Sequence, residues 1–235
     1  MDGWGIAKAG EESRSAVLAA NTPFYDSILT KYPHSKLEAS GLAVGLPAGQ
    51  MGNSEVGHTN LGAGRVVYQD LVKINLAVES GSLGNEKVLV DALEYAKING
   101  KKVHFIGLVS NGGVHSHINH LKGLCQIAND RGLKDVFVHA FTDGRDCDPK
   151  SGLAFLTELN ASMQQSTGRI ASVVGRYYAM DRDRRWERVI KAYELLVNGL
   201  GTPTTNVIAS LRESYEKNIT DEFIDPLVVV NENNE

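Results

Sequence analysis

The sequence predicts an α/β fold with a parallel sheet, because strand-like and helix-like segments alternate along much of the chain. Short apolar runs rich in valine, isoleucine and phenylalanine recur from residue 101 onward. Between them lie longer segments whose apolar residues recur at helical spacing. Such alternation is typical of parallel strands joined by crossover helices. A chain of 235 residues is long enough for one large domain or two small ones.

The individual elements follow from composition and from their end signals. We expect strands at residues 103–109, 136–141, 169–174 and 226–230. We expect helices at residues 117–131, 152–163, 186–197 and 206–217. Closer to the N-terminus, Thr22-Pro23 has the composition of a helix start, and residues 36–40 are a candidate short strand.

Composition excludes several classes of protein. The net charge of −4 argues against a general nucleic-acid surface. The two cysteines, Cys125 and Cys147, are too few for a disulfide framework and indicate a reducing compartment. No apolar run approaches the roughly 20 residues of a membrane span, and the N-terminus lacks a signal-peptide pattern. We therefore expect a cytoplasmic protein with no nucleic-acid or membrane partner.

The glycine-rich stretch from Leu46 to Gly64 contains one good nucleophile, Ser54. Asn53-Ser54 is a plausible helix start, because both residue types favour the N-cap. A hydroxyl at that position lies among free backbone N–H groups at the positive end of a helix dipole, where a phosphate is stabilised. One interpretation is therefore a serine that carries a phosphoryl group. The alternative is a glycine-rich turn in which Ser54 only caps a helix.

A loop of unusual polar content follows each of three predicted strands. The first loop contains His115, the second contains Arg145 and Asp146, and the third contains Arg176 and Arg182. The carboxyl ends of parallel strands lie on one rim of a sheet, where ligands bind. Arginine reads carboxylate and phosphate groups through paired hydrogen bonds. The three loops together predict a site for a small ligand that has both groups.

Other charged side chains have structural interpretations. His104 and His139 lie within predicted strands and are expected as satisfied core histidines. We expect His117 to have a capping or a surface role, and Arg188 to lie on a solvated, salt-bridged face. His58 follows Ser54 by one helical turn and is expected to support that loop.

Five long motifs carry a resemblance to a known family. The stretch MGNSEVGH at 51–58 resembles the nucleophile segment of cofactor-independent (2,3-bisphosphoglycerate-independent) phosphoglycerate mutases. Four further segments match the same family in the same order: MDGWGI at 1–6, SNGGVHSH at 110–117, HAFTDGRDCDP at 139–149, and GRYYAMDRDRRWERV at 175–189.

The resemblance implies a partial alkaline-phosphatase-like phosphatase domain at residues 1–68, with an inserted α/β phosphotransferase domain at 69–235. It places the phosphoserine at Ser54 and metal ligands at Asp2 and Ser54, since hard carboxylate oxygen suits Mn²⁺ or Mg²⁺. It also implies substrate contacts at five positions: His115, Arg145, Asp146, Arg176 and Arg182.

The implied activity is the interconversion of 3-phosphoglycerate and 2-phosphoglycerate in glycolysis and gluconeogenesis, through a phosphoserine. The family uses two divalent metal ions, for which we expect Mn²⁺ with Mg²⁺ or Co²⁺ as alternatives, and no 2,3-bisphosphoglycerate. We expect a monomer whose only partner is the phosphoglycerate substrate. Family chains are about twice this length and carry most metal ligands in the later half, so we expect this chain alone to be inactive. The alternatives are a metal-dependent phosphomonoesterase or another phosphomutase of the alkaline-phosphatase-like superfamily, and a non-catalytic phosphoglycerate-binding fragment.

Overall fold

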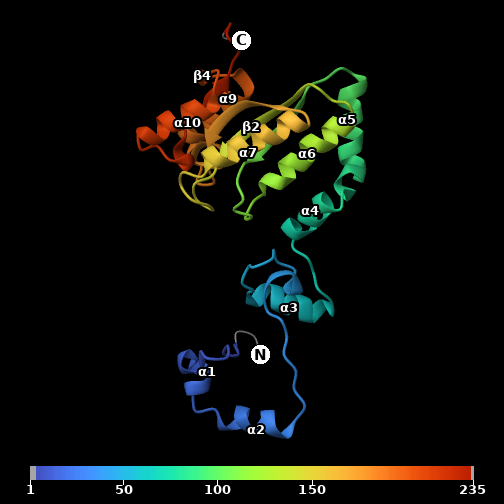
Figure 1. Cartoon of the computed structure of the whole chain (residues 1–235), viewed down its shortest axis with the longest axis vertical. Coiled ribbons are helices and arrows are strands. Elements are labelled where there is room, and N and C mark those ends of the chain that lie inside the picture. Colours follow the sequence, from blue (N-terminus) through green and yellow to red (C-terminus); the bar gives the residue numbers. More distant parts are fainter. Residues whose placement is uncertain (1–3, 234–235) are drawn as a thin grey trace. The chain divides into compact units, whose positions relative to one another are not determined.

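The structure is a computed structural model that describes residues 4–233. The chain forms two compact units, Met1–Val72 and Lys73–Glu235, which are considered separately (Figure 1). Asp2, one of the predicted metal ligands, lies outside the described residues. No helix of residues 4–233 has both the length and the apolar composition needed to cross a membrane.

The first unit is built from short helices, and its small apolar cluster of Val44, Leu46 and Val56 joins η2 to α3. Its elements are η1 (Glu12–Arg14), α1 (Ala16–Ala19), α2 (Pro23–Lys31), η2 (Gly41–Val44) and α3 (Ser54–Ala63). The expected strand at residues 36–40 is wrong, because only the isolated bridge between Ser40 and Met51 forms there. A strand needs a continuous ladder with a neighbour, and this segment has one bridging pair.

The second unit contains a five-stranded sheet in the order β1-β2-β3-β5-β4. The strands are β1 (Val103–Leu108), β2 (Val136–Thr142), β3 (Arg169–Gly175), β4 (Thr202–Thr204) and β5 (Leu227–Val229). Strands β1, β2 and β3 are parallel as predicted, but β5 runs antiparallel to β3. The prediction of a wholly parallel sheet is therefore wrong at β5. Strands β4 and β5 are parallel to each other and are joined by helix α10, so both run opposite to β3.

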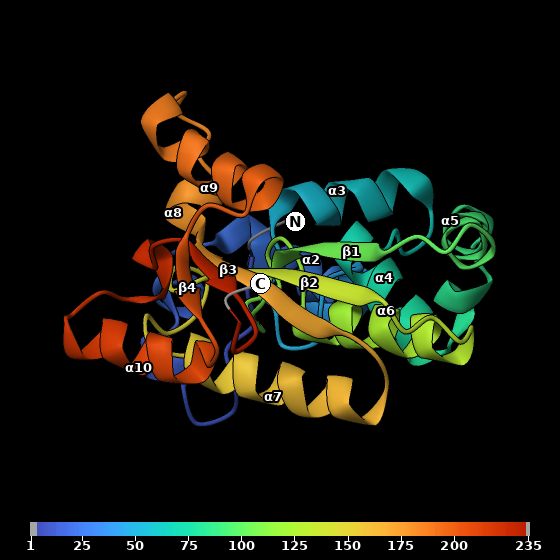
Figure 2. The same cartoon turned by 90° about the horizontal axis from the view of Figure 1, so that it is seen from above.

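Helices cover both faces of this sheet unequally. The helices of this unit are α4 (Asp70–Glu79), which begins in the first unit, η3 (Ser82–Asn85), α5 (Lys87–Ile98), α6 (Ile118–Asp130), α7 (Gly152–Gln165), α8 (Arg176–Ala179), α9 (Trp186–Asn198), α10 (Val207–Glu216) and η4 (Asp221–Phe223). Figure 2 shows α6, α7 and α10 on one face and α9 on the other, beside β3. The expected helices are confirmed, and α9 ends at Gly199, whose φ of 66° is the left-handed conformation that glycine adopts at helix ends.

The main core lies between the sheet and the helices α6, α7 and α10. Alternate residues of β2, Val138 and Ala140, point into it, as a half-buried strand requires. Leu156 and Leu159 of α7 and Leu211 of α10 have no exposed surface. Burial of apolar surface here is the main stabilising contribution to this unit.

The opposite face of β1, β2 and β3 carries a row of hydrogen-bonded polar side chains. His104 Nδ1 lies 2.9 Å from His139 Nε2, and His139 Nδ1 lies 2.7 Å from Ser172 Oγ. His139 is half-buried, but His104 is exposed, as is Ile106 with 58% of its surface accessible. The expectation that His104 is a core histidine is therefore wrong. Strand alternation places it on the face that α6 and α7 do not cover.

We predict that Leu156→Ala lowers the free energy of unfolding by about 2–5 kcal/mol, because it leaves a cavity in the main core. Val88→Ala is the matched control, since Val88 is 84% exposed. Urea unfolding of both variants measures the difference. A loss below about 1 kcal/mol for Leu156→Ala would contradict this description of the core.

Candidate functional site

The loops that follow β1, β2 and β3 converge on the guanidinium of Arg176, the first residue of α8. Its Nη1 donates to Asp143 Oδ1 at 2.7 Å and to Asp146 Oδ2 at 2.6 Å. Its Nη2 lies 3.2 Å from His115 Nε2. We call His115, Asp143, Asp146 and Arg176 the site cluster. Three of its members are residues that the sequence singled out.

Asp143 is the member that sequence reasoning missed. It is 1% exposed, and its carboxylate accepts four hydrogen bonds. Oδ2 accepts from Ser110 Oγ at 2.6 Å, while Oδ1 accepts from Arg176 and from the backbone N–H groups of Arg145 and Asp146, at 3.1 and 2.9 Å. This carboxylate therefore joins all three loops. Its position before a glycine, in an Asp-Gly turn that closes a strand, was the available sequence signal.

Burial and hydrogen bonding act against each other on these charges. Burial alone would raise the pKa of Asp143, but hydrogen bonds from Asp146, Ser110, Arg176 and Arg145 outweigh it and leave the pKa below its usual value. Burial alone would lower the pKa of the Arg176 guanidinium, but Asp146 and Asp143 raise it. Both groups therefore stay charged at neutral pH. The Arg176 fork is largely occupied by protein partners, which fixes its orientation.

The other two predicted arginines are more accessible. The side chain of Arg145 is 59% exposed, and its Nη1 lies 3.9 Å from Glu222 Oε1. Arg182 is exposed and forms no ion pair with any residue between 4 and 233. Of the five predicted substrate contacts, the structure thus brings together His115, Asp146 and Arg176, and leaves two arginines directed to solvent or to a weak partner.

Helix α9 holds α8 in place. The Arg188 guanidinium lies 3.9 Å from the centre of the Tyr177 ring and pairs with Asp181 at 3.6 Å. Lys191 Nζ lies 4.7 Å from the centre of the Tyr178 ring. These cation–π contacts orient the short helix that presents Arg176. The expected salt bridge of Arg188 is confirmed, but its side chain is only 25% exposed, so the expected solvated position is wrong.

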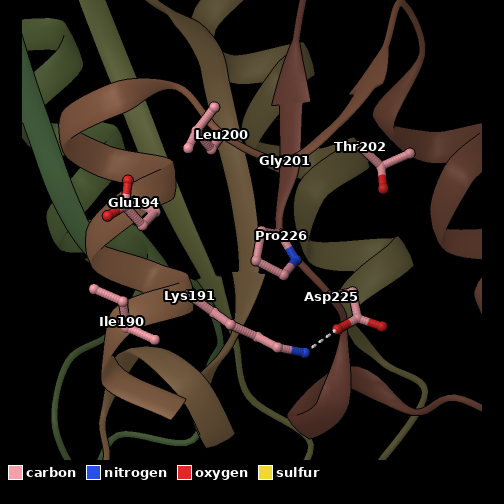
Figure 3. Close-up of a pocket in the computed structure, with 8 residues that line it drawn as sticks. All are labelled: Ile190, Lys191, Glu194, Leu200, Gly201, Thr202, Asp225 and Pro226. Atoms are coloured by element: carbon pink, nitrogen blue, oxygen red, sulfur yellow. Dashed lines mark hydrogen bonds and ion pairs between the residues drawn. The ribbon is translucent and has the colours of Figure 1, made fainter. Parts of the chain in front are cut away.

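A hollow of about 460 Å³ lies between α9 and the residues that lead into β4 and β5 (Figure 3). Ile190, Leu200 and Pro226 give it apolar walls, and an ion pair of 3.2 Å joins Lys191 to Asp225 at its edge. None of the site cluster lines this hollow. It is therefore separate from the place where the three loops meet.

In the first unit, Ser54 is the first residue of α3. The Asn53 side chain caps the helix by accepting from the Val56 N–H at 3.1 Å, as the sequence predicted. His58 Nδ1 lies 2.8 Å from the Ser54 carbonyl oxygen and 3.1 Å from Ser54 Oγ. A carbonyl oxygen only accepts, so Nδ1 carries the proton and His58 donates toward Ser54. The expected supporting role of His58 agrees with this geometry. His117 likewise caps α6, by accepting from Asn119 N–H at 3.2 Å.

Ligands for a divalent metal are not gathered in the described part of the chain. Between residues 4 and 233, no three histidine, cysteine or acidic side chains lie together in the manner of a metal site. Ser54 offers one hydroxyl oxygen, and Asp2 lies outside the described residues. The described residues therefore do not form a divalent metal site by themselves.

Comparison with known proteins decides the family. Residues 74–235 match the family model described as the BPG-independent PGAM N-terminus. The chain belongs to the BPG-independent phosphoglycerate mutase family. A 2,3-bisphosphoglycerate-independent phosphoglycerate mutase of Flavobacterium johnsoniae is 60% identical over 233 residues, and one of Bacteroides fragilis is 55% identical over 228 residues. These alignments cover 99% and 97% of this chain, and 46% and 45% of the two mutases.

A solved phosphoglycerate mutase of Leishmania mexicana, crystallised at low cobalt concentration, has the same fold. It is 35% identical, with a TM-score of 0.72 over 94% of this chain and 42% of the Leishmania chain. The predicted α/β fold of the phosphoglycerate mutase family is thereby confirmed. The chain spans a little less than half the length of the mutases that it matches.

We predict that Asp143→Asn lowers the free energy of unfolding at pH 7 by about 1.5–3 kcal/mol, because the charged hydrogen bond from Arg176 is lost. The lowered pKa of Asp143 means that its stabilisation is present above the usual aspartate pKa of about 3.9 and is lost as the pH falls further. The difference between wild type and variant should therefore shrink below about pH 4.

Urea unfolding from pH 7 to pH 3 measures this difference. The control is Asp135→Asn, whose side chain is 66% exposed and pairs with Arg169 at 3.8 Å, and which should change stability little at any pH. A constant difference between wild type and Asp143→Asn across the range would rule out a charged Asp143 as its source.

Proposed function

We propose that this chain supplies the nucleophile and the phosphoglycerate-binding residues of a mutase that interconverts 3- and 2-phosphoglycerate. The observation that supports this most directly is the site cluster, in which three loops bring His115, Asp146 and Arg176 together. The chain also belongs to a family of phosphoglycerate mutases. A phosphoglycerate has a phosphate, a carboxylate and a hydroxyl, and needs several cations and one hydrogen-bond acceptor.

The charges suit such a ligand. Arg145 and Arg182 are exposed and able to form paired hydrogen bonds with a phosphate or a carboxylate. His115 Nε2 lies 3.6 Å from Asp146 Oδ2, and its side chain is 42% exposed, so it also reaches solvent. Asp146 can accept a hydrogen bond from the ligand hydroxyl. Arg176 retains donors beyond its Nη1, which Asp143 and Asp146 occupy.

Ser54 is the proposed nucleophile. Its oxygen attacks the phosphorus of 3-phosphoglycerate, the bond from phosphorus to the glycerate oxygen breaks, and the serine proton ends on that departing oxygen. The other glycerate hydroxyl then attacks the phosphoserine and restores the Ser54 hydroxyl. The free N–H groups at the start of α3 stabilise the negative charge of the phosphoserine. No 2,3-bisphosphoglycerate is needed, because the serine stores the phosphoryl group.

The chain alone is proposed to bind phosphoglycerate without turnover. The site cluster lies entirely within the second unit, which has its own core. The two divalent ions expected in the family, Mn²⁺ first and Mg²⁺ or Co²⁺ as alternatives, would draw further ligands from the part of the mutases that this chain does not span. A cytoplasmic, monomeric enzyme remains our expectation for the complete protein.

We predict that Ser54→Ala abolishes phosphoryl transfer in a chimera in which this chain replaces the matching part of the Flavobacterium johnsoniae mutase. Loss of a covalent nucleophile costs on the order of 10⁴–10⁶ in rate. Ser27→Ala is the control, since Ser27 is another helical serine, half-buried in α2. Conversion of labelled 3-phosphoglycerate to 2-phosphoglycerate is the measurement, and release of labelled inorganic phosphate would instead support a phosphomonoesterase. Activity of the Ser54→Ala chimera within tenfold of the parent chimera would exclude Ser54 as nucleophile.

We predict that Arg182→Lys weakens binding of 3-phosphoglycerate to this chain by about 10- to 100-fold, since lysine cannot form the planar two-bond contact. Arg184→Lys is the matched control, because Arg184 is exposed two positions further along the same loop. Titration calorimetry gives both affinities. Equal affinities for wild type and Arg182→Lys would show that Arg182 does not contact the ligand.

A further inference from the structure

We propose that Asp221 and Tyr215 are positioning residues, which fix the loop that carries Arg145 and Asp146 in its ligand-binding conformation. Both lie outside every motif that the sequence singled out, more than 60 residues after that loop. The proposal rests on the proposed function, because it concerns the same phosphoglycerate site.

Asp221 is a fully buried carboxylate whose partners are neutral groups. It is 0% exposed, its Oδ2 accepts from the Gly152 N–H at 2.7 Å, and its Oδ1 accepts from the Tyr215 hydroxyl. No arginine or lysine of residues 4–233 forms an ion pair with it. Burial raises the pKa of the Asp221 carboxyl. Burial also raises the pKa of Tyr215, and its hydrogen bond to Asp221 raises it further. Because no cation partners this buried carboxylate, its hydrogen bonds to Gly152 and Tyr215 must satisfy it, and they fix its position.

These two side chains cap α7 from a distance. Ser151 precedes the helix but makes no side-chain cap, since its hydroxyl donates to the Asp148 carbonyl at 2.6 Å. The first two N–H groups of α7 are instead bound by Asp221, at Gly152, and by the Tyr215 hydroxyl, which accepts from the Leu153 N–H at 3.2 Å. The end of the loop is thereby fixed to the segment after α10.

The backbone of Asp221 fixes the loop at both ends. Its carbonyl oxygen accepts from Thr142 Oγ1 at 2.6 Å, where β2 ends, and its N–H donates to the Pro149 carbonyl at 2.9 Å, just before α7. The first and last residues of the loop are therefore both hydrogen-bonded to the backbone of Asp221. Between these two contacts lie Arg145 and Asp146.

Asp221 lies so close to Gly144 and Gly152 that neither position has room for a side chain. A Cβ at Gly144 would lie 2.9 Å from the Asp221 Cβ, and one at Gly152 would lie 2.6 Å from Asp221 Oδ1. Gly144 also has a φ of 67°, which favours glycine. The neighbouring Glu222 reaches Arg145 at 3.9 Å. Displacement of Asp221 therefore changes the direction in which Arg145 and Asp146 point.

The test compares Asp221→Ala with Asp221→Asn and with Asp225→Ala. Asp225 is the matched control, because it lies on the same segment but its side chain is 55% exposed and its partners are Lys191 of α9 and Tyr178 of α8, not the loop after β2. Calorimetry with 3-phosphoglycerate should show at least a tenfold loss for Asp221→Ala and less than a twofold change for Asp225→Ala. Asp221→Asn should recover affinity to within threefold of wild type, since its oxygen can accept from Gly152 and its amide can donate to Tyr215.

Hydrogen exchange provides a readout that needs no ligand. The N–H groups of Arg145 and Asp146 should exchange at least tenfold faster in Asp221→Ala, while those of β2 remain protected. If the wild-type chain does not bind 3-phosphoglycerate, the proposed function fails and exchange alone decides the positioning role. A folded Asp221→Ala chain with wild-type affinity and exchange overturns the proposal.

Tyr215→Phe covers the case in which Asp221→Ala does not fold. It keeps the ring and removes only the hydroxyl that joins Asp221 to Leu153. We expect a three- to tenfold loss of affinity and faster exchange of the same two N–H groups. Wild-type values for both measurements in Tyr215→Phe overturn the proposal in that case.

Discussion

The arrangement of the second unit depends on one buried charge interaction, that of Arg176 with Asp143 and Asp146. A guanidinium with only 9% of its side chain exposed is tolerated because two carboxylates neutralise it. Asp143 and Asp146 come from the loop after β2, whereas Arg176 begins the helix after β3. The interaction thus fixes two loops to each other, and Ser110 adds the third through Asp143. Removal of Arg176 would take the cation from both aspartates, whereas removal of either aspartate would leave Arg176 with one carboxylate partner.

Local pattern was sufficient for the regular elements but not for the contacts that join them. Strand and helix periods predicted β1, β2, β3, α6, α7, α9 and α10, and parallel topology then placed the loops with His115, Arg145 and Arg176 on one rim. Asp143 was missed because its importance comes from partners 33 residues away on either side, which no local pattern shows. The predicted direction of β5 was wrong for a similar reason. The direction depends on which strands β5 lies beside, which is a tertiary property.

The first unit was harder to predict because it has few buried residues to impose a pattern. The cap at Asn53 was predicted, since capping is encoded by the residue itself. The supposed strand at residues 36–40 was wrong, because an extended segment becomes a strand only with a partner. The metal ligands could not be assembled from this chain, whose matched mutases are about twice as long.

The capping of α7 has a consequence for how anion recognition can evolve here. A helix N-terminus is a common backbone site for phosphate, and such a site changes little when side chains are substituted. At α7 that position is already filled by the protein's own Asp221 carboxylate. An anion beside the start of α7 would therefore need side chains such as those of Arg145, because this helix N-terminus is already occupied. Single substitutions can alter or redirect such recognition, whereas the fold that presents it stays the same.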